Sequence, residues 1–324
     1  MPALPEQFKD ARSNVEPKEP DVANAIKAHK SVREVLERCD ALGDMGIDTV
    51  LIGSYDRHVS IHRMKDVDVL SKVPEAGAVA PKDLLDIVED ALTMEYGSDR
   101  VERQARSIKV DFPDYDLSVD AVPARPCGDH WEIPDAGSGW EETDPPKLAE
   151  LSTAMNASYD EHYVPTVKLI RQTRRTHLKD DPPGGLYLEI ATYHAFKAGL
   201  EGDSAAAYFV AALDGVAKQL AAAAVNGLPD PTLEGKTITT RAKAEEIAAA
   251  AELFRELAAD AHTALNSDEA CAAAKTFRDV LGRDSDDAWV FPMPSYCNDD
   301  GTRRSKAAAT VAGSPTVTED SRFA

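Results

Sequence analysis

The chain has 324 residues, with 36 Lys and Arg against 57 Asp and Glu, and its formal net charge is −21. A hydrophobic fraction of 43% argues against a wholly disordered chain. The acidity disfavours an extended DNA-binding surface, because duplex binding depends on Lys and Arg side chains that displace counterions. The length indicates about two folded units.

The sequence also bears on location and on cysteine chemistry. No stretch approaches the roughly 18 consecutive apolar residues that span a bilayer, and the first residues lack the apolar region of a secretion signal. We therefore expect a cytoplasmic protein without a membrane partner. Cys39, Cys127, Cys271 and Cys297 lie far apart, with no CxxC pair and no clustered histidines. This spacing predicts reduced thiols rather than structural zinc or a disulfide framework.

The first half of the chain alternates between helical and extended patterns. Apolar residues recur at helical spacing in two segments, and short β-branched or alternating runs separate them. We predict helices over 21–42 and 81–96, and strands over 49–52, 66–70, 106–112 and 116–122.

The second half is richer in Ala and Leu. Residues 125–147 are rich in Gly, Pro and Asp, which predicts a connection with at most one short strand around 131–133. Helical periodicity then predicts helices near 159–178, 187–200, 203–225, 238–264 and 267–281. We divide the chain into a core over 1–147, a helical lobe over 148–294 and a mobile tail over 295–324.

Two aspartates in the strand DVDVL are the clearest candidates for chemistry. Asp66 and Asp68 are two residues apart, so their side chains point to the same face of a strand. Converging carboxylates on a rigid strand can bind a pair of divalent cations for phosphoryl or nucleotidyl transfer. The alternative is an edge strand with solvated acids. The apolar neighbours Val67 and Val69 favour burial, which is costly for carboxylates without a cation.

A metal site of this kind needs a third acid from another strand. Asp120 is the best candidate, because Val119 and Ala121 face the opposite way and a proline follows closely. The alternatives are Asp111, Asp114 and Asp116, which lie nearer to a turn. Gly53 and Ser54 directly follow a strand, so their amides and hydroxyl could receive phosphate oxygens. A plain turn is the alternative for this pair.

These motifs together resemble the active site of polymerase-beta-type nucleotidyltransferases. The resemblance rests on 53–61 (GSYDRHVSI), on DVD at 66–68 and on VDAVPA at 119–124. Within that superfamily the chain is most similar to the bacterial CD-NTases, synthases of second-messenger oligonucleotides. Later segments also resemble this family, at 140–145 (WEETDP), 163–171 (YVPTVKLIR) and 186–190 (LYLEI).

The resemblance implies a fold and a set of site residues. It implies an α+β fold, in which a mixed sheet with helices forms the core and the active site lies in the cleft beside the helical lobe. The residues that it assigns fall into four groups. Asp66, Asp68 and Asp120 would bind two Mg²⁺ ions, or Mn²⁺ in their place; Gly53 and Ser54 would hold the triphosphate; Lys168 or Arg171 would contact phosphates; and Tyr187 would stack on a base. Lys168 and Arg171 could instead form an exposed helix face, and Tyr187 could belong to the core.

The resemblance further implies synthesis of a cyclic di- or trinucleotide from NTPs, with pyrophosphate released, in antiphage (CBASS-type) signalling. The product would activate an effector protein. A ubiquitin-transfer-like enzyme could conjugate the tail that ends at Ala324. One alternative is an enzyme that transfers a single NMP to a small molecule, protein or RNA end. A non-enzymatic nucleotide-binding protein is disfavoured, because none of the metal-binding acids is missing.

Overall fold

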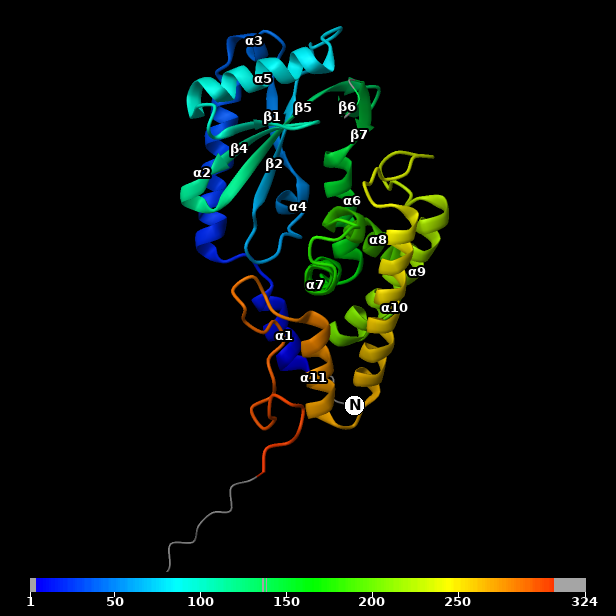
Figure 1. The fold of residues 1–324 in the computed structure, drawn as a ribbon. Coiled ribbons are helices and arrows are strands. Elements are labelled where there is room, and N and C mark those ends of the chain that lie inside the picture. Colours follow the sequence, from blue (N-terminus) through cyan, green and yellow to red (C-terminus); the bar gives the residue numbers. More distant parts are fainter. Residues whose placement is uncertain (1–3, 136, 138, 306–324) are drawn as a thin grey trace, which may run out of the picture.

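A computed structural model describes residues 4–135, 137 and 139–305 of the chain. It contains an N-terminal lobe built on a sheet and a C-terminal lobe built of helices (Figure 1). This arrangement confirms the expected α+β fold. The helices in the first part of the chain are α1 (Pro5–Asn14), α2 (Glu19–Glu37), α3 (Asp40–Gly43), α4 (Gly53–Asp56) and α5 (Pro81–Tyr96).

A mixed sheet forms the centre of the first lobe. Its strands are β1 (Asp48–Ile52), β2 (Asp66–Lys72), β3 (Val101–Arg103), β4 (Ile108–Phe112) and β5 (Leu117–Cys127), with a 3₁₀ turn, η1 (Pro113–Tyr115), between the last two. The order is β1-β2-β5-β4-β3. β2 and β5 are parallel, whereas the other neighbours are antiparallel.

The alternation of side chains decides which face of this sheet is buried. Val67 and Val69 of β2, with Val119 and Ala121 of β5, are fully buried in a core shared with α2 and α5. Residues of the opposite parity therefore face away from these two helices. In Figure 1 that other side of the sheet is turned toward the helical lobe.

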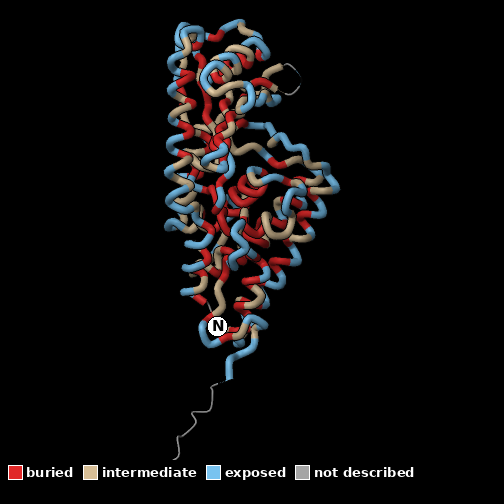
Figure 2. The backbone as a smooth tube through the Cα atoms, turned by 60° about the vertical axis from the view of Figure 1, so that its left-hand side comes forward, coloured by how far each residue is buried: buried red, intermediate tan, exposed pale blue. Residues whose placement is uncertain are grey.

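The second lobe consists of α6 (Pro145–Ser158), α7 (Tyr163–His177), α8 (Gly185–Lys197), α9 (Ala205–Asn226), α10 (Ala244–Asn266) and α11 (Ala270–Leu281). Helix α9 alone, among the described helices, is long and apolar enough to cross a membrane. Its apolar side chains pack in the large core of this lobe, against α8 and α10. Buried segments run through the interior of both lobes in Figure 2.

The N-terminal helix α1 was not predicted, and it packs with the second lobe. Phe8 is 1% exposed. Its ring centroid lies 6.1, 4.9 and 5.1 Å from those of Phe209, Phe277 and Phe291. The first helix thus completes the core of the C-terminal lobe, where Val59 and Ile61 from the predicted core unit also pack.

The segment between the lobes has more regular structure than its composition predicts. β5 continues to Cys127, and two further strands follow, β6 (His130–Pro134) and β7 (Trp140–Thr143). β6 pairs with β5 and β7 pairs with β6, both antiparallel. These three strands form a ribbon that extends from the sheet. Turn residues dominate the composition here because the strands are short.

The prediction of four reduced thiols was wrong for two cysteines. Cys271 at the start of α11 and Cys297 form a disulfide, with their Cα atoms 5.4 Å apart. Cys297 is fully buried and its backbone forms a bridge with that of Arg303. Residues 295–305 therefore do not have the free conformation expected of the tail. The rest of the predicted tail, 306–324, lies outside the described residues.

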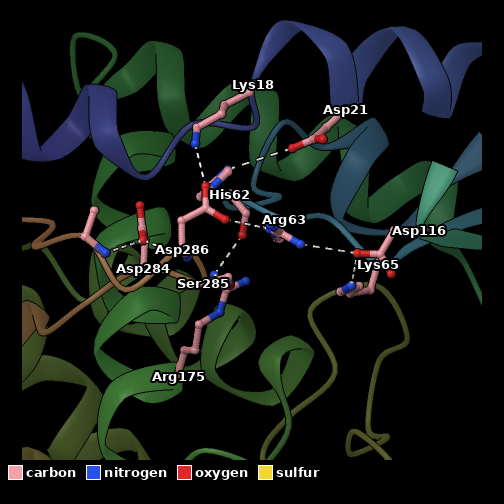
Figure 3. Close-up of polar contacts among 11 residues, drawn as sticks. Lys18, Asp21, His62, Arg63, Lys65, Asp116, Arg175, Asp284, Ser285 and Asp286 are labelled. Carbon is pink, nitrogen blue, oxygen red and sulfur yellow. Dashed lines mark hydrogen bonds and ion pairs between the residues drawn. The ribbon is translucent and has the colours of Figure 1, made fainter.

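A polar cluster joins the two lobes on the side shown in Figure 3. Asp286 follows α11, and its carboxylate lies 2.6 Å from Lys18 Nζ, 2.8 Å from His62 Nε2 and 2.8 Å from Arg63 Nε. These hydrogen bonds lower the pKa of Asp286. Arg175 of α7 adds a hydrogen bond of 2.7 Å to the carbonyl oxygen of His62. The position of the sheet relative to the helices is therefore fixed by contacts from both lobes.

Candidate active site

Strand pairing brings the three predicted acids to one face of the sheet. β2 and β5 are parallel, and Asp68 is the register partner of Asp120. Asp66 precedes Asp68 by two residues on β2, so the three side chains have the same parity. This is the face opposite to α2 and α5. The condition for a shared cation site, three carboxylates from two strands side by side, is met.

The raised pKa values of two of these acids indicate a site that binds a positively charged group. Burial raises the pKa of Asp68 to about 7, with Asp66 and Asp120 adding repulsion. Burial also raises the pKa of Asp120 to about 6, with Asp66 next in effect. The Oδ1 atom of Asp120 is buried without a hydrogen-bond partner. Carboxylates in this state are the hard oxygen ligands that divalent cations take, so the residues fit the expected metal ions.

The turn after β1 lies directly against Asp68. Gly53 begins α4 with φ of 76°, a conformation that side chains disfavour. A Cβ atom at this position would overlap the carboxylate of Asp68. The hydroxyl of Ser54 lies 3.0 Å from that of Ser60. The glycine therefore permits the close approach of backbone and acid that the site requires.

A cavity of about 420 Å³ lies in front of these groups. Both lobes and the strand ribbon contribute to its walls. The lining residues include Gly53, Ser54, Arg57, Asp66, Asp68, Thr143, Asp144, Arg171, Gly185, Leu186, Asp230 and Thr232. A second cavity of about 590 Å³ shares Thr143, Leu186, Asp230 and Ile238 with the first. The two cavities therefore adjoin and together provide space for more than one ligand.

Two arginines and one buried glutamate connect the lobes behind the acids. Glu189 of α8 is 1% exposed. It accepts hydrogen bonds from Arg57 Nε at 2.6 Å and Arg57 Nη2 at 3.1 Å, and from Arg171 Nη1 at 3.4 Å. Both arginines line the cavity, and their charges oppose the rise in the pKa of Asp68. Glu189 thus holds the guanidinium groups of both arginines at the wall of the cavity.

The other predicted residues lie elsewhere. Lys168 is buried in an ion pair with Glu16 and lines a separate cavity beside Tyr55 and Ser60. Tyr187 is 3% exposed and lines a neighbouring cavity rather than the one that contains the acids. Their roles in phosphate and base binding stay predictions. Leu186, the residue before Tyr187, is 47% exposed and lines the cavity that contains Asp66 and Asp68.

Neither Asp120 nor the rival acids are among the residues that line this cavity, so strand register and ion pairing distinguish them. Asp116 pairs with Lys65 at 2.5 Å, and Asp111 pairs with Lys109 at 2.9 Å. Asp114 is exposed in η1. Asp120 is thus the acid that strand register brings to Asp68.

Arg57, Glu189 and Asp230 were not predicted as site residues. Thr143 and Asp144, in the segment 140–145 that resembles the family, line the cavity. Arg57 and Glu189 also lie in segments that resemble the family, 53–61 and 186–190. Their pairing was not predictable, because they are 132 positions apart in the chain.

The variant Gly53→Ala is expected to reduce catalysis on the order of a hundredfold. The new methyl group would displace the Asp68 carboxylate, and misplacement of a catalytic group by about 1 Å costs that much. Gly43→Ala is the matched control, since a Cβ at Gly43 meets nothing within 4 Å. Initial rates of pyrophosphate release measure the effect. Equal rates for Gly53→Ala and wild type would contradict the close approach.

Comparisons with known proteins agree with this geometry. Residues 3–156 match the family model SMODS, the Second Messenger Oligonucleotide or Dinucleotide Synthetase domain. The matched residues, 3–156, thus belong to this family of second-messenger synthetases, as in the bacterial CD-NTases. This confirms the family that the motifs predicted. A similar curated protein is the cyclic AMP-AMP-AMP synthase of Acinetobacter sp. (strain ATCC 27244 / 9458), at 26% identity over 289 residues, covering 86% of this CD-NTase and 84% of that protein.

Solved structures of similar fold include two nucleotide complexes. E. coli MS115-1 CdnC with ATP has a TM-score of 0.70 at 16% identity, covering 89% of this chain and 98% of that one. Bradyrhizobium diazoefficiens CdnG with GTP has a TM-score of 0.68 at 19% identity, covering 86% and 97%. The CD-NTase fold thus extends over both lobes.

Proposed function

We propose that this CD-NTase joins NTPs into a cyclic di- or trinucleotide with release of pyrophosphate. The observation that carries the proposal is the placement of Asp66, Asp68 and Asp120 on one face, beside Gly53 and a cavity between the lobes. The repeated transfer that closes a ring requires two nucleotides at one centre. The adjoining cavities of about 420 and 590 Å³ support this requirement.

The residues of the chain have distinct roles in this reaction. The three aspartates would hold two Mg²⁺ ions, which would supply positive charge for the attacking ribose oxygen and the departing pyrophosphate. Ser54 and the backbone at Gly53 would orient the triphosphate. Arg171 would compensate phosphate charge from the helical lobe, and Glu189 would fix its position. A ribose hydroxyl then forms a bond to the α-phosphorus while the bond from that phosphorus to pyrophosphate breaks.

ATP is the first substrate to test. The curated relative is a cyclic AMP-AMP-AMP synthase, and the CdnC structure contains ATP. The CdnG structure contains GTP, so the other NTPs belong in the same experiment. We place the reaction in the cytoplasm, in antiphage (CBASS-type) signalling, with the product switching on an effector protein. A ubiquitin-transfer-like enzyme acting on the C-terminal residues is part of the same proposal.

Mass spectrometry of the reaction products tests the function. Purified protein is incubated with each NTP alone and with all four, in Mg²⁺ and in Mn²⁺. The expected product has the mass of two or three nucleoside monophosphates joined with loss of water at every link, ring closure included. The double variant Asp66→Asn/Asp68→Asn should give no product.

Two outcomes would overturn the proposal. A product that contains a single NMP on an added small molecule, protein or RNA end would identify the alternative transferase. Equal product from the wild type and the double variant would show that these acids do not carry the chemistry.

A further inference from the structure

We propose that Cys127, His130 and Glu142 bind one zinc ion on the strand ribbon, at a place separate from the catalytic acids. The ligand atoms of these three residues lie within 4.8 Å of one another. All three side chains are partly buried. Contraction by about 1 Å would bring them to the spacing of ligands around a tetrahedral zinc ion, where Zn–S is about 2.3 Å and Zn–N about 2.0 Å.

Strand register explains why the three side chains converge. Cys127 ends β5 and His130 begins β6, and the two are register partners across a turn of two residues. On the same face, Glu132 follows His130 by two positions and is the register partner of Glu142 on β7. The ligands therefore come from three adjacent strands. A rigid ribbon holds them at low entropic cost.

The surrounding charges leave His130 Nε2 and one oxygen of Glu142, Oε2, available for a metal ion, whereas Oε1 of Glu142 faces Lys236. Glu132, the other acid on this face, pairs with Arg125 at 2.5 Å. The Nε2 atom of His130 is buried without a hydrogen-bond partner, and it lies 3.3 Å from Glu142 Oε2. An imidazole nitrogen that faces a carboxylate and a thiol is arranged as in a coordination site.

The ligand chemistry selects the metal. A thiolate, an imidazole and a carboxylate form a borderline-soft set that suits zinc, whereas Mg²⁺ takes oxygen ligands. The fourth position would be open to water. Asp120 lies seven residues from Cys127 on β5, about 23 Å at strand spacing. The site is therefore too distant to take part in the transfer reaction.

Zinc at this position would affect the wall of the larger cavity. Glu142 lines that cavity and pairs with Lys236 at 3.3 Å, and Lys236 also lines it. Coordination would engage the Glu142 carboxylate and leave the Lys236 ammonium free to face an anionic ligand. The metal would also fix β6 and β7, which carry other residues of this wall, among them Ile133 and Trp140.

Cobalt substitution tests the site directly. The full chain, with its Cys271–Cys297 disulfide intact and without added thiol reductant, is titrated with Co²⁺ in excess Mg²⁺ that occupies the catalytic carboxylates. We expect one equivalent to give a thiolate-to-cobalt charge-transfer band, which zinc removes by displacement. The variant Cys127→Ser should lose the band. Cys39→Ser is the matched control and should keep it, because Cys39 is the other unpaired cysteine and lies outside the cluster.

A second variant and a second measurement keep the test decisive if Cys127→Ser folds poorly. His130→Gln and Glu142→Gln should each weaken zinc binding by more than the roughly tenfold to hundredfold that outer-shell partners contribute, as measured by competition with a chelating dye. Circular dichroism checks that each variant is folded. Absence of a thiolate band in the wild type, or its persistence in Cys127→Ser, would overturn the proposal. A variant that loses nucleotide synthesis but keeps this band would bear on the proposed function and not on the zinc site.

Discussion

Asp68→Asn is expected to reduce nucleotide synthesis by about 10³-fold or more. The substitution keeps the size of the side chain but removes a charged ligand from the pair of cations. A loss of about 4 kcal/mol in transition-state stabilisation corresponds to that factor. The measurement is pyrophosphate release at saturating NTP and Mg²⁺. Asp114→Asn is the control, because Asp114 is exposed in η1 and does not line the cavity.

The same variant is expected to stabilise the protein when no divalent cation is present. The pKa of Asp68 is raised from 3.8 to about 7 in the folded state, so folding disfavours its ionised form. This penalty is absent below about pH 4, grows as the pH rises, and is complete above about pH 7. At about 1.4 kcal/mol per pKa unit it reaches about 4 kcal/mol.

Urea unfolding of both proteins in EDTA, from pH 5 to pH 8, would measure the difference. The free energy of unfolding of the wild type should fall relative to Asp68→Asn as the pH rises. Added Mg²⁺ should restore the wild type more at the upper end of this range. A difference that does not change with pH would contradict the raised pKa.

Glu189→Gln is expected to destabilise the protein by about 3–5 kcal/mol, because it leaves a buried guanidinium without its counter-charge. Burial has the largest single effect on the pKa of Arg57 and lowers it, but the charge and hydrogen bonds of Glu189, with Asp68 and Tyr163, together raise the pKa. Chemical denaturation at neutral pH measures the change. Glu252→Gln is the control: Glu252 pairs with Arg255 on the surface, where such pairs contribute about 0–1 kcal/mol.

A double variant separates the charge pair from the packing around it. Arg57→Met/Glu189→Leu removes both charges and keeps apolar volume, so it should recover most of the stability lost in Glu189→Gln. It should not recover activity, since Arg57 lines the catalytic cavity. Equal stability of Glu189→Gln and wild type would mean that water or another group satisfies Arg57.

The acids were predictable because strand geometry is local. Side chains alternate between the two faces of a strand, so Asp66 and Asp68 lie on one face regardless of the neighbouring elements. Asp116 has the same parity as Asp120, and the sequence set it aside only because it lies at the edge of a turn. The register between β2 and β5 places Asp120 opposite Asp68. The position of Gly53 directly after a strand suggested its phosphate role, which stays a prediction, and the Ala- and Leu-rich second half indicated the helical lobe.

Residues that depend on contacts between lobes were not predictable in this way. Lys168 and Arg171 lie one turn apart on α7, and the helical pattern treats them alike. The structure turns Arg171 to the cavity and Lys168 to Glu16, which precedes α2. The Cys271–Cys297 disulfide likewise depends on how the chain after α11 folds back. Such pairings follow from tertiary packing, for which spacing in the sequence carries no signal.

The packing of α1 against the far end of the chain bears on how the protein is made. During synthesis α1 is made before its partners, because Phe8 packs against Phe209, Phe277 and Phe291, which all follow the sheet in the chain. A nascent chain can therefore complete its sheet while its first helix still has no partner. A product that stopped before α11 would therefore carry Asp66, Asp68 and Asp120 while Phe8 lacked two of its three aromatic neighbours.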